Sequence, residues 1–479
     1  MSEGAAKKEE KPRKFQAIRG TRDLLPPETA LWNRVEQAVH EVFATFGFGE
    51  IRLPILDPTE LFARSIGVDT DVVSKEMFTF WDPFDQRLPP KYQIEEARAR
   101  GINIQNEGEL ATIGLALSFQ QLTLRPEATA SVCRAYIERN MQQLPQPVKL
   151  YTIGPMFRRE RPQKGRYRQF YQIDAEVLGG SDAPGIDAEL IEMVMTFLER
   201  LGLEGVQLHI NSIGDKNCRP KYVELLREEL RKVKDKLGPD SQRRVETNPL
   251  RVLDSKVEGE QEIIEKLPRI SQHLCDACRE NYDEVKRQLA LRGIVYSQNF
   301  RLVRGLDYYV RTTFEITAKG LGSQNAVCGG GRYDGLIELL GGPPTRATGF
   351  AIGEDRLILS LQEQAKSKEV ASGEWRVASE KPRVEVYVAW MGEKAYATAI
   401  RAAKNLRAAG FSVELPPVEQ KFGKALGQAD KLGARYALIL GDNEVESGEW
   451  TLKTLATGEQ GKFAEAQLLE FLGKKRSGE

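Results

Sequence analysis

GPMFRRERPQKGRYRQFYQIDAEVLG, residues 154–179, joins an arginine-rich loop to an alternating run with aromatic residues. Between Arg158 and Arg168 there are six basic residues, five of them arginine, and one acidic residue, Glu160. Arginine stays charged and binds oxyanions through two parallel hydrogen bonds, so this composition favours phosphate or carboxylate recognition. The flanking runs predict paired strands, with Phe170 beside the loop as a stacking surface. We therefore expect a nucleotide with a reacting phosphate here; a solvated basic surface is the alternative.

The composition of the whole chain indicates a globular protein of two or three domains. It has 479 residues, of which 41% are hydrophobic and 29% charged. We find neither a long apolar run nor a signal-peptide pattern, and five cysteines are too few for a disulfide framework. We therefore expect a cytoplasmic protein without membrane contacts. Because 69 basic residues balance 69 acidic ones, a nucleic-acid partner must be argued from local clusters.

Strand and helix patterns predict an α+β core that is interrupted by helices and followed by a separate domain. Strands come first, then charged helices, then strands again, which favours a largely antiparallel sheet over a doubly wound one. A clean strand–helix alternation after a polar segment predicts a small α/β domain at the C-terminal end. The expected parts are a disordered tail (1–14), a core (15–203 and 300–361) with an insertion of uncertain order (85–121), a helical insertion (204–299), a linker (362–383) and the α/β domain (384–479).

Several separate segments resemble the motifs of class II aminoacyl-tRNA synthetases. FRRERPQKGRYRQF is similar to motif 2, GFAIGEDRL to motif 3, and the helix–strand unit that ends at Pro54 to motif 1. LVRGLDYY and GGGRYDGL resemble the two signature peptides of histidyl-tRNA synthetases, and LRPEATA, NPLRVLDSK and the C-terminal domain fit the same family. The resemblance extends from about Arg19 to the C-terminus.

This resemblance implies a fold, an activity and partners. The fold would be a class II antiparallel-sheet catalytic core with a helical insertion and a C-terminal anticodon-binding domain. The enzyme would activate L-histidine with ATP and Mg²⁺ to histidyl-adenylate, and then transfer the histidyl group to tRNA(His). Motif 1 usually forms the subunit interface in this family, so a homodimer is expected. The helical insertion would steady the acceptor arm of the tRNA.

Three other functions are the alternatives. A non-catalytic regulatory subunit of ATP phosphoribosyltransferase, in histidine biosynthesis, would share the core fold but lack the C-terminal domain and catalytic arginines. A synthetase for another amino acid would lack the two histidyl signature peptides. An RNA-binding scaffold without chemistry is the third. The chain carries the arginines, the tail domain and both signatures, so the synthetase is the preferred interpretation.

The first chemical step calls for fixed positive charge. A carboxylate is already ionised at neutral pH, so positioning and electrostatic stabilisation are the available means of catalysis. This fits a chain with only three histidines. The resemblance implies that Arg304 and Arg158 are catalytic cations at the α-phosphate. It also implies that Arg166 reaches the outer phosphates, Phe170 stacks on adenine and Arg356 covers the other adenine face. A core salt bridge is the alternative role of Arg304.

The histidine pocket is expected on one strand of the core. Side chains two residues apart share a strand face, so Gln172, Asp174 and Glu176 are expected to point the same way. A pocket that hydrogen-bonds both imidazole nitrogens rejects analogues, because these leave buried polar groups unpaired. The resemblance implies that Glu176 contacts the imidazole and that Gln172 lines the site.

Two further segments complete the expected pocket. The resemblance implies that Tyr309 contacts the imidazole, with Tyr333 nearby and Tyr308 also lining the pocket. Core packing is the alternative role of the paired tyrosines. Glu127 and Thr129 would hold the α-amino group. The glycines of CGGGRYDGL are interpreted as permitting close backbone approach beside the pocket.

The segment HLCDACRE has the spacing of metal ligands. It contains His273, Cys275 and Cys278, and Cys218 is a fourth candidate. A lone CxxC without a clear partner pair is weak evidence for zinc, so a structural role is the preferred interpretation. No protein ligand for a metal is therefore assigned.

Overall fold

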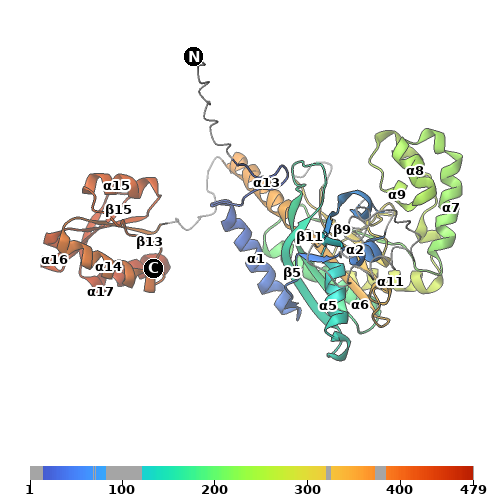
Figure 1. Cartoon of the computed structure of the whole chain (residues 1–479), viewed down its shortest axis with the longest axis horizontal. Coiled ribbons are helices and arrows are strands. Elements are labelled where there is room, and N and C mark those ends of the chain that lie inside the picture. Colours follow the sequence, from blue (N-terminus) through green and yellow to red (C-terminus); the bar gives the residue numbers. More distant parts are fainter. Residues whose placement is uncertain are drawn as a thin grey trace, which may run out of the picture. The chain divides into compact units, whose positions relative to one another are not determined.

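The computed structural model describes residues 15–67, 70, 72–81, 121–319, 325–372 and 384–477. The chain divides into two compact units, Met1–Lys368 and Glu369–Glu479 (Figure 1). The expected tail (1–14) lies outside the described residues, as do the insertion (85–121, apart from Gln121) and the second part of the expected linker. Within the described ranges, no helix is both long and apolar enough to span a bilayer.

The first unit is built on a sheet that has eight strands among the described residues. Its inner strands are antiparallel, and only the outermost pairs, β1–β5 and β7–β8, run parallel. This confirms the prediction of a largely antiparallel α+β core. In spatial order the strands are β1 Gly49–Glu50, β5 Val148–Phe157, β6 Gln169–Leu178, β11 Ala347–Gly353, β10 Ala326–Arg332, β9 Val310–Thr317, β7 Gln207–Ser212 and β8 Ser297–Gln298.

Helices α1 (Glu28–Thr45), α6 (Pro184–Arg200) and α11 (Asp276–Leu291) cover one face of this sheet. The predicted apolar stripe of α1 is buried, because a spacing of three and four residues places Trp32, Val35, Val39, Val42 and Phe43 on one side. α1 packs against α6, and α6 packs against α11. Their side chains form one core with those of β6, β11 and β9. The candidate active site lies on the other face of the sheet.

A smaller three-stranded sheet adjoins the first one. It consists of β2 (Leu56–Pro58), β4 (Gln121–Leu124) and β3 (Phe78–Trp81), and it is accompanied by α2 (Thr59–Ile66) and α5 (Thr129–Glu138). The strand predicted for GEIRLPIL is reduced to β1 and β2. Pro54 lacks an N–H, and the carbonyls of Leu53 and Pro54 accept hydrogen bonds from Arg125 instead of from a strand.

The segment 204–299 differs from the expected helical insertion at both ends. β7 pairs with β9, and β8 pairs with β7. Alternating apolar residues of β7 and periodic ones of α11 belong to the sheet's core. The remaining helices form a group at one end of the unit (Figure 1). They are α7 Arg219–Lys232, α8 Pro239–Thr247, α9 Leu250–Leu253 and α10 Gln261–Glu265.

Two helices close the first unit. α12 (Leu336–Leu339) follows β10, and α13 (Glu354–Ser372) follows β11. α13 continues through the first part of the expected linker. Lys, Glu, Gln and Ala dominate that stretch, and all four are strong helix formers.

The second unit is a five-stranded α/β sheet in the described range 384–477. β13, β12 and β14 are parallel, whereas β15 and β16 are added antiparallel. Two apolar clusters make up its core. The elements are β12 Val386–Trp390, α14 Glu393–Ala408, β13 Val413–Glu414, α15 Phe422–Lys431, β14 Tyr436–Leu440, α16 Asp442–Ser447, β15 Trp450–Thr454, β16 Gln460–Phe463 and α17 Glu465–Ser477. The first five match the predicted alternation.

Candidate active site

The inner strand β6 presents three polar side chains on the sheet face opposite to α1, α6 and α11. Gln172, Asp174 and Glu176 of β6 are all buried and share this face, as their spacing predicts. Directly opposite them in β11 stand Gly353, Ala351 and Gly349. Small residues of β11 therefore stand beside the three polar side chains, and Gly349 leaves the room that Glu176 fills.

The glycine-rich strand β10 continues the run of small residues on this face of the sheet. Gly329 and Gly331 stand opposite Ala351 and Gly349 of β11. A Cβ at Gly329 would come within 2.6 Å of Cζ of Arg304, and one at Gly331 within 3.0 Å of Cα of Thr313. The predicted role of these glycines in close approach is confirmed, because larger residues would displace Arg304 or the neighbouring strand.

Unpartnered polar atoms gather on this face. In the described residues, both carboxylate oxygens of Asp174, Oε1 of Gln172, Oγ1 of Thr313 and Nε of Arg304 are buried without a hydrogen-bond partner. Buried polar groups in native proteins are nearly always paired, so each such group needs an explanation. Their concentration on one face indicates a site for a polar ligand.

Glu176 is the hub of the expected histidine pocket. Its Oε1 accepts a hydrogen bond from the Thr129 hydroxyl at 2.6 Å, and its Oε2 accepts one from the Tyr333 hydroxyl at 2.5 Å. Burial raises the pKa of Glu176 well above its ordinary value, and the two hydrogen bonds only partly counter this. Burial also raises the pKa of Asp174, and the nearby Glu127 raises it further.

The tyrosines surround Glu176. The rings of Tyr308 and Tyr309 lie 4.7 Å apart between centroids, and those of Tyr308 and Tyr333 lie 5.6 Å apart. All three also belong to the apolar cluster that extends into α7–α9, so they do pack in a core. Burial raises the pKa of Tyr309 to about 12, so its phenol stays protonated at neutral pH and can donate a hydrogen bond.

Glu127 caps the helix that carries Thr129. Its carboxylate accepts hydrogen bonds from the backbone N–H groups of Thr129 (2.8 Å) and Ala130 (2.9 Å) at the start of α5. A carboxylate at a helix N-terminus satisfies free donors and interacts favourably with the helix dipole. Burial raises the pKa of Glu127, whereas these hydrogen bonds and Arg158 lower it.

The arginine loop joins β5 to β6 as predicted; Arg158 and Arg166 are half-buried, whereas Arg159, Arg161 and Lys164 are exposed. Nε of Arg158 donates to the carbonyl of Pro126 at 2.9 Å, and its guanidinium lies 5.3 Å from the Phe170 ring centroid. Arg166 forms an ion pair with Glu160 at 3.1 Å. The aromatic ring and the cation expected to bind a nucleotide are therefore in contact.

Arg356 of α13 closes over the same loop. Its guanidinium donates to the carbonyls of Gly165 (3.2 Å) and Ala326 (3.1 Å). Burial lowers the pKa of Arg356, and the positive charges of Arg166 and Arg158 lower it further. Three arginines from two distant segments thus repel one another across a small space, an arrangement that an anionic ligand would stabilise.

Arg304 joins this group through Glu315 of β9. The two side chains form an ion pair at 3.5 Å, and the Glu315 carboxylate also acts on Arg356. Cζ of Arg304 lies 5.7 Å from the Tyr309 ring centroid, so Arg304 stands between the tyrosines and the other arginines, Arg158, Arg166 and Arg356. Arg304 therefore forms the salt bridge that was its alternative role, and it also lies at the centre of the site.

Two residues of the site had no role assigned from the sequence. Arg125 is buried, donates to the Pro155 carbonyl at 2.9 Å and holds the end of the motif 1 segment. Gly349 leaves the room that Glu176 occupies. The alternating pattern of small and large residues in TGFAIG was the one available signal for Gly349.

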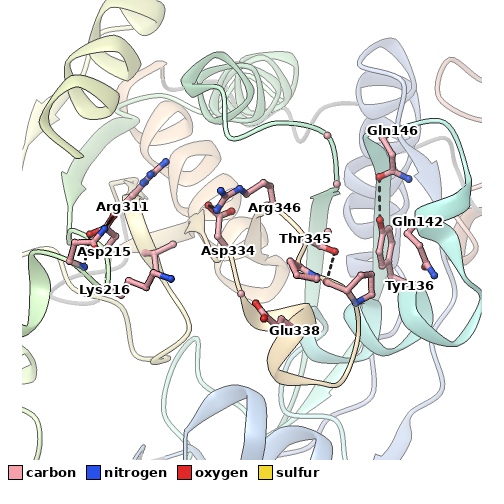
Figure 2. A pocket seen from close by; sticks show the side chains of 17 residues that line it. Tyr136, Gln142, Gln146, Asp215, Lys216, Arg311, Asp334, Glu338, Thr345 and Arg346 are labelled. Atoms are coloured by element: carbon pink, nitrogen blue, oxygen red, sulfur yellow. Dashed lines mark hydrogen bonds and ion pairs between the residues drawn. The ribbon is translucent and has the colours of Figure 1, made fainter. Parts of the chain in front are cut away.

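A cavity in the first unit lies near the candidate site without including any of its residues. It has a volume of about 1050 Å³ and is lined by none of the predicted site residues (Figure 2). Val310 and Asp334, which follow Tyr309 and Tyr333 in sequence, lie on its wall.

Comparisons with known proteins identify the family of the chain. The family model described as "Histidyl-tRNA synthetase" matches residues 84–357, and the one described as "Anticodon binding domain" matches residues 385–475. A histidine–tRNA ligase of Koribacter versatilis is 50% identical, with 97% of this chain and 98% of the relative covered. One of Solibacter usitatus is 48% identical, with 93% and 96% covered.

A solved structure extends this agreement to the fold. The apo histidyl-tRNA synthetase of S. aureus superimposes with a TM-score of 0.71 at 32% identity, covering 96% of this chain and 99% of its own. The matches span both units and every segment that carries a signature motif. The chain therefore belongs to the histidyl-tRNA synthetase family.

Proposed function

We propose that this protein activates L-histidine with ATP and transfers the histidyl group to tRNA(His). In the first step a carboxylate oxygen of histidine attacks the α-phosphorus of ATP, and pyrophosphate leaves. In the second step a hydroxyl of the terminal adenosine of the tRNA attacks the histidyl carbonyl, and AMP leaves. The observation that carries the proposal is a single sheet face that joins clustered arginines to a pocket of buried carboxyl groups.

The phosphate side of the site would be held by arginines. Arg304 lies between the two halves of the site, so it is assigned with Arg158 to the α-phosphate. Arg166 is assigned to the outer phosphates, and Phe170 and Arg356 to the two faces of adenine. The charge that builds up on the five-coordinate phosphorus is stabilised by these preorganised guanidinium groups without any general base. ATP enters as its Mg²⁺ complex.

The amino-acid side of the site would be held by carboxyl groups. Glu176 and Asp174 are buried carboxyls with raised pKa values, and a cationic or hydrogen-bond-donating ligand stabilises their charged forms. Glu176 and Tyr309 are assigned to the imidazole, with Tyr333 fixing the orientation of Glu176. Glu127, Thr129 and Gln172 are assigned to the α-amino side. Tyr308 packs behind Tyr309.

A homodimer is proposed on the basis of exposed apolar surface near motif 1. Ile55, Leu56 and Phe80 are each more than 40% exposed, and they lie on or beside the small sheet. Large apolar side chains grouped on a surface mark interaction sites. An Ile55→Glu variant is expected to shift the mass measured by light scattering from dimer toward monomer. A cytoplasmic location is proposed because the substrates ATP and tRNA meet there.

The regulatory-subunit alternative is not favoured. The relatives that cover nearly the whole chain carry the name histidine–tRNA ligase, and the chain has the anticodon-binding unit. The arginines that such a subunit is expected to lose are present and cluster together. The helical group α7–α10 is proposed to steady the acceptor arm of the tRNA, and the second unit to bind the anticodon.

The deciding experiment is ATP–pyrophosphate exchange measured with each amino acid separately. Exchange that depends on histidine, followed by charging of tRNA(His), is the expected result. Exchange with a different amino acid alone would contradict the assigned specificity, and no exchange with any amino acid would contradict the assigned chemistry.

A further inference from the structure

Four metal-type ligands meet outside the site described above. The ligand atoms of Asp215, Cys218, Cys275 and Cys278 all lie within 4.8 Å of one another. In the part of the chain that the structure describes, this is the one group of three or more His, Cys, Asp or Glu side chains that close together. His273, a candidate from its spacing, is not a member, because its exposed ring packs against Tyr222.

The sequence supplies these ligands as two matched pairs. Asp215 and Cys218 are separated by two residues, as are Cys275 and Cys278. Cys218 immediately precedes α7, Cys275 immediately precedes α11, and Cys278 lies in the first turn of α11. Two short ligand loops that face each other are the usual construction of a structural zinc site. The missing partner of the CxxC pair is thus the DxxC pair.

Two distances between ligand atoms are close to those of tetrahedral coordination. Sγ of Cys218 lies 3.6 Å and Sγ of Cys275 lies 4.0 Å from Oδ1 of Asp215. Four ligands around zinc, at about 2.3 Å for sulfur and about 2.0 Å for oxygen, stand roughly 3.5–3.8 Å from one another. All four ligand atoms lie within 4.8 Å of one another, so closing around an ion needs side-chain adjustments of up to about 1 Å.

We propose that Asp215, Cys218, Cys275 and Cys278 bind one zinc ion as a structural site. Three thiolates select zinc over magnesium or calcium, which prefer oxygen ligands. Four protein ligands fill a tetrahedral shell and leave no open position, so the ion has a structural rather than a catalytic role. Asp215 also lies on the wall of the neighbouring cavity, which gives the ion a path in and out (Figure 2).

The ion would fix the loop that supports the tyrosine pocket. Arg219, next to Cys218, donates to the carbonyls of Gly214 (3.1 Å) and Tyr309 (2.6 Å). The backbone N–H of Arg311 donates to the Gly214 carbonyl at 2.8 Å. The ligand loop is therefore bonded to the backbone on both sides of Val310, directly after Tyr309. Zinc bound here fixes the positions of α7, α11 and Tyr309 relative to one another.

Metal content of the full-length protein tests the proposal without reference to activity. The protein is purified with a reductant and without chelators, and zinc is counted by mass spectrometry of the metal. We expect one zinc ion per chain, and almost none in Cys278→Ser and in the double variant Cys218→Ser/Cys275→Ser. His273→Ala is the matched control, because it changes the nearest ligand-type side chain outside the cluster and should keep the ion. Asp215→Cys should also keep it, with four thiolates.

Cobalt provides a second readout that does not require the cysteine variants to fold. Wild-type protein is stripped by a chelator and reloaded with Co²⁺. Thiolate-to-cobalt charge-transfer bands and the strong visible bands of tetrahedral cobalt are expected, and they should be lost again when zinc is added. Sub-stoichiometric zinc in the wild type together with an octahedral cobalt spectrum would overturn the proposal. So would a disulfide between two of the three cysteines in the protein purified under reducing conditions.

Discussion

Arg304 occupies space that only a glycine at position 329 leaves open. Its guanidinium packs against the backbone there and pairs with Glu315. We expect Arg304→Ala to keep the fold and to lower the rate of histidine-dependent pyrophosphate exchange by about 10²–10³-fold, because one preorganised donor contributes about 3–4 kcal/mol to the transition state. Arg304→Lys should recover only part of the rate, since an ammonium group cannot bind two oxygens in the same plane.

The control for this variant is another arginine outside the site. Arg287 on α11 pairs with Glu284 and is exposed, so Arg287→Ala should exchange at the wild-type rate. Thermal melting of both variants separates a structural role from a chemical one. Full exchange activity in Arg304→Ala would refute its catalytic assignment, and an equal loss of stability in Arg304→Ala and Glu315→Gln with unchanged exchange would assign it to the salt bridge.

Gly349 is required by the position of Glu176. A Cβ at residue 349 would overlap Oε2 and lie 2.5 Å from Cδ of that carboxylate. We expect Gly349→Ala to push Glu176 away from Thr129 and Tyr333, and to raise the KM for histidine by at least about tenfold, which corresponds to about 1.4 kcal/mol of lost binding. The KM for ATP should change much less. Exchange kinetics with each substrate varied in turn provide the measurement.

Gly353→Ala in the same strand is the matched control. A Cβ there meets nothing closer than Arg356 at 3.6 Å, an ordinary contact. This variant should therefore keep the KM for histidine. If both glycine variants behave alike, the histidine pocket does not lie over Glu176.

At the scale of elements, the contact between α1 and α13 contains a buried acid. Glu354, the first residue of α13, is fully buried, and neither of its carboxylate oxygens has a hydrogen-bond partner in the described residues. Burial, together with the negative charges of Glu36 on α1 and of Asp355, raises the pKa of Glu354 from 4.5 to about 9. The side chain is therefore protonated at neutral pH.

This acid makes stability depend on pH in a defined direction. Between pH 4.5 and about 9 the folded state keeps a proton that the unfolded chain releases, so this group lowers the free energy of unfolding as pH rises. The slope reaches about 1.4 kcal/mol per pH unit. We expect Glu354→Gln, which cannot ionise, to equal the wild type near pH 4.5 and to become progressively more stable than it toward pH 9.

Thermal melting of both proteins across this pH range measures the effect. Glu36→Gln removes one of the repelling charges, so it should lower the pKa of Glu354 and narrow the pH range over which the free energy of unfolding falls. Parallel curves for wild type and Glu354→Gln would show that Glu354 is not protonated in the folded protein.

At the scale of the whole molecule, each of the two units has its own apolar core. A chain that ends at residue 372 is therefore expected to fold and to keep histidine-dependent pyrophosphate exchange. Charging of tRNA(His) should fall by about a hundredfold or more, equivalent to about 3 kcal/mol of lost tRNA binding. Exchange and charging assays on the same preparation check this. Equal loss of both activities would mean that the core depends on the second unit.

Much of the fold could be predicted from short-range pattern. The stripe of α1, the strand pair around the arginine loop and the first five elements of the second unit follow from apolar spacing, which repeats within a few residues. The boundaries of the helical insertion could not be predicted in the same way. The place of β7 in the sheet depends on pairing with β9 from a distant part of the chain, and that of the two-residue strand β8 on pairing with β7.

The candidate site, too, could be predicted where it follows from local sequence, and could not be predicted where it depends on distant strands. The shared face of Gln172, Asp174 and Glu176 follows from strand geometry alone, and the arginine loop from its composition. The resemblance suggested which distant residues belong together, but not that Glu315 lies between Arg304 and Arg356, or that Gly349 makes room for Glu176. These relations depend on strand register across β6, β11, β10 and β9.

From the amino-acid order alone come the family, the two-unit organisation and the residue types that meet phosphate and imidazole. Folding in three dimensions added the partners: Asp187 for the buried Arg332, and Asp215 with Cys218 for the CxxC pair. Periodicity is written into neighbouring residues, because backbone geometry repeats every two or 3.6 positions. A contact between residues far apart in the chain exists only after loop closure and cooperative packing, so it cannot be read from local pattern.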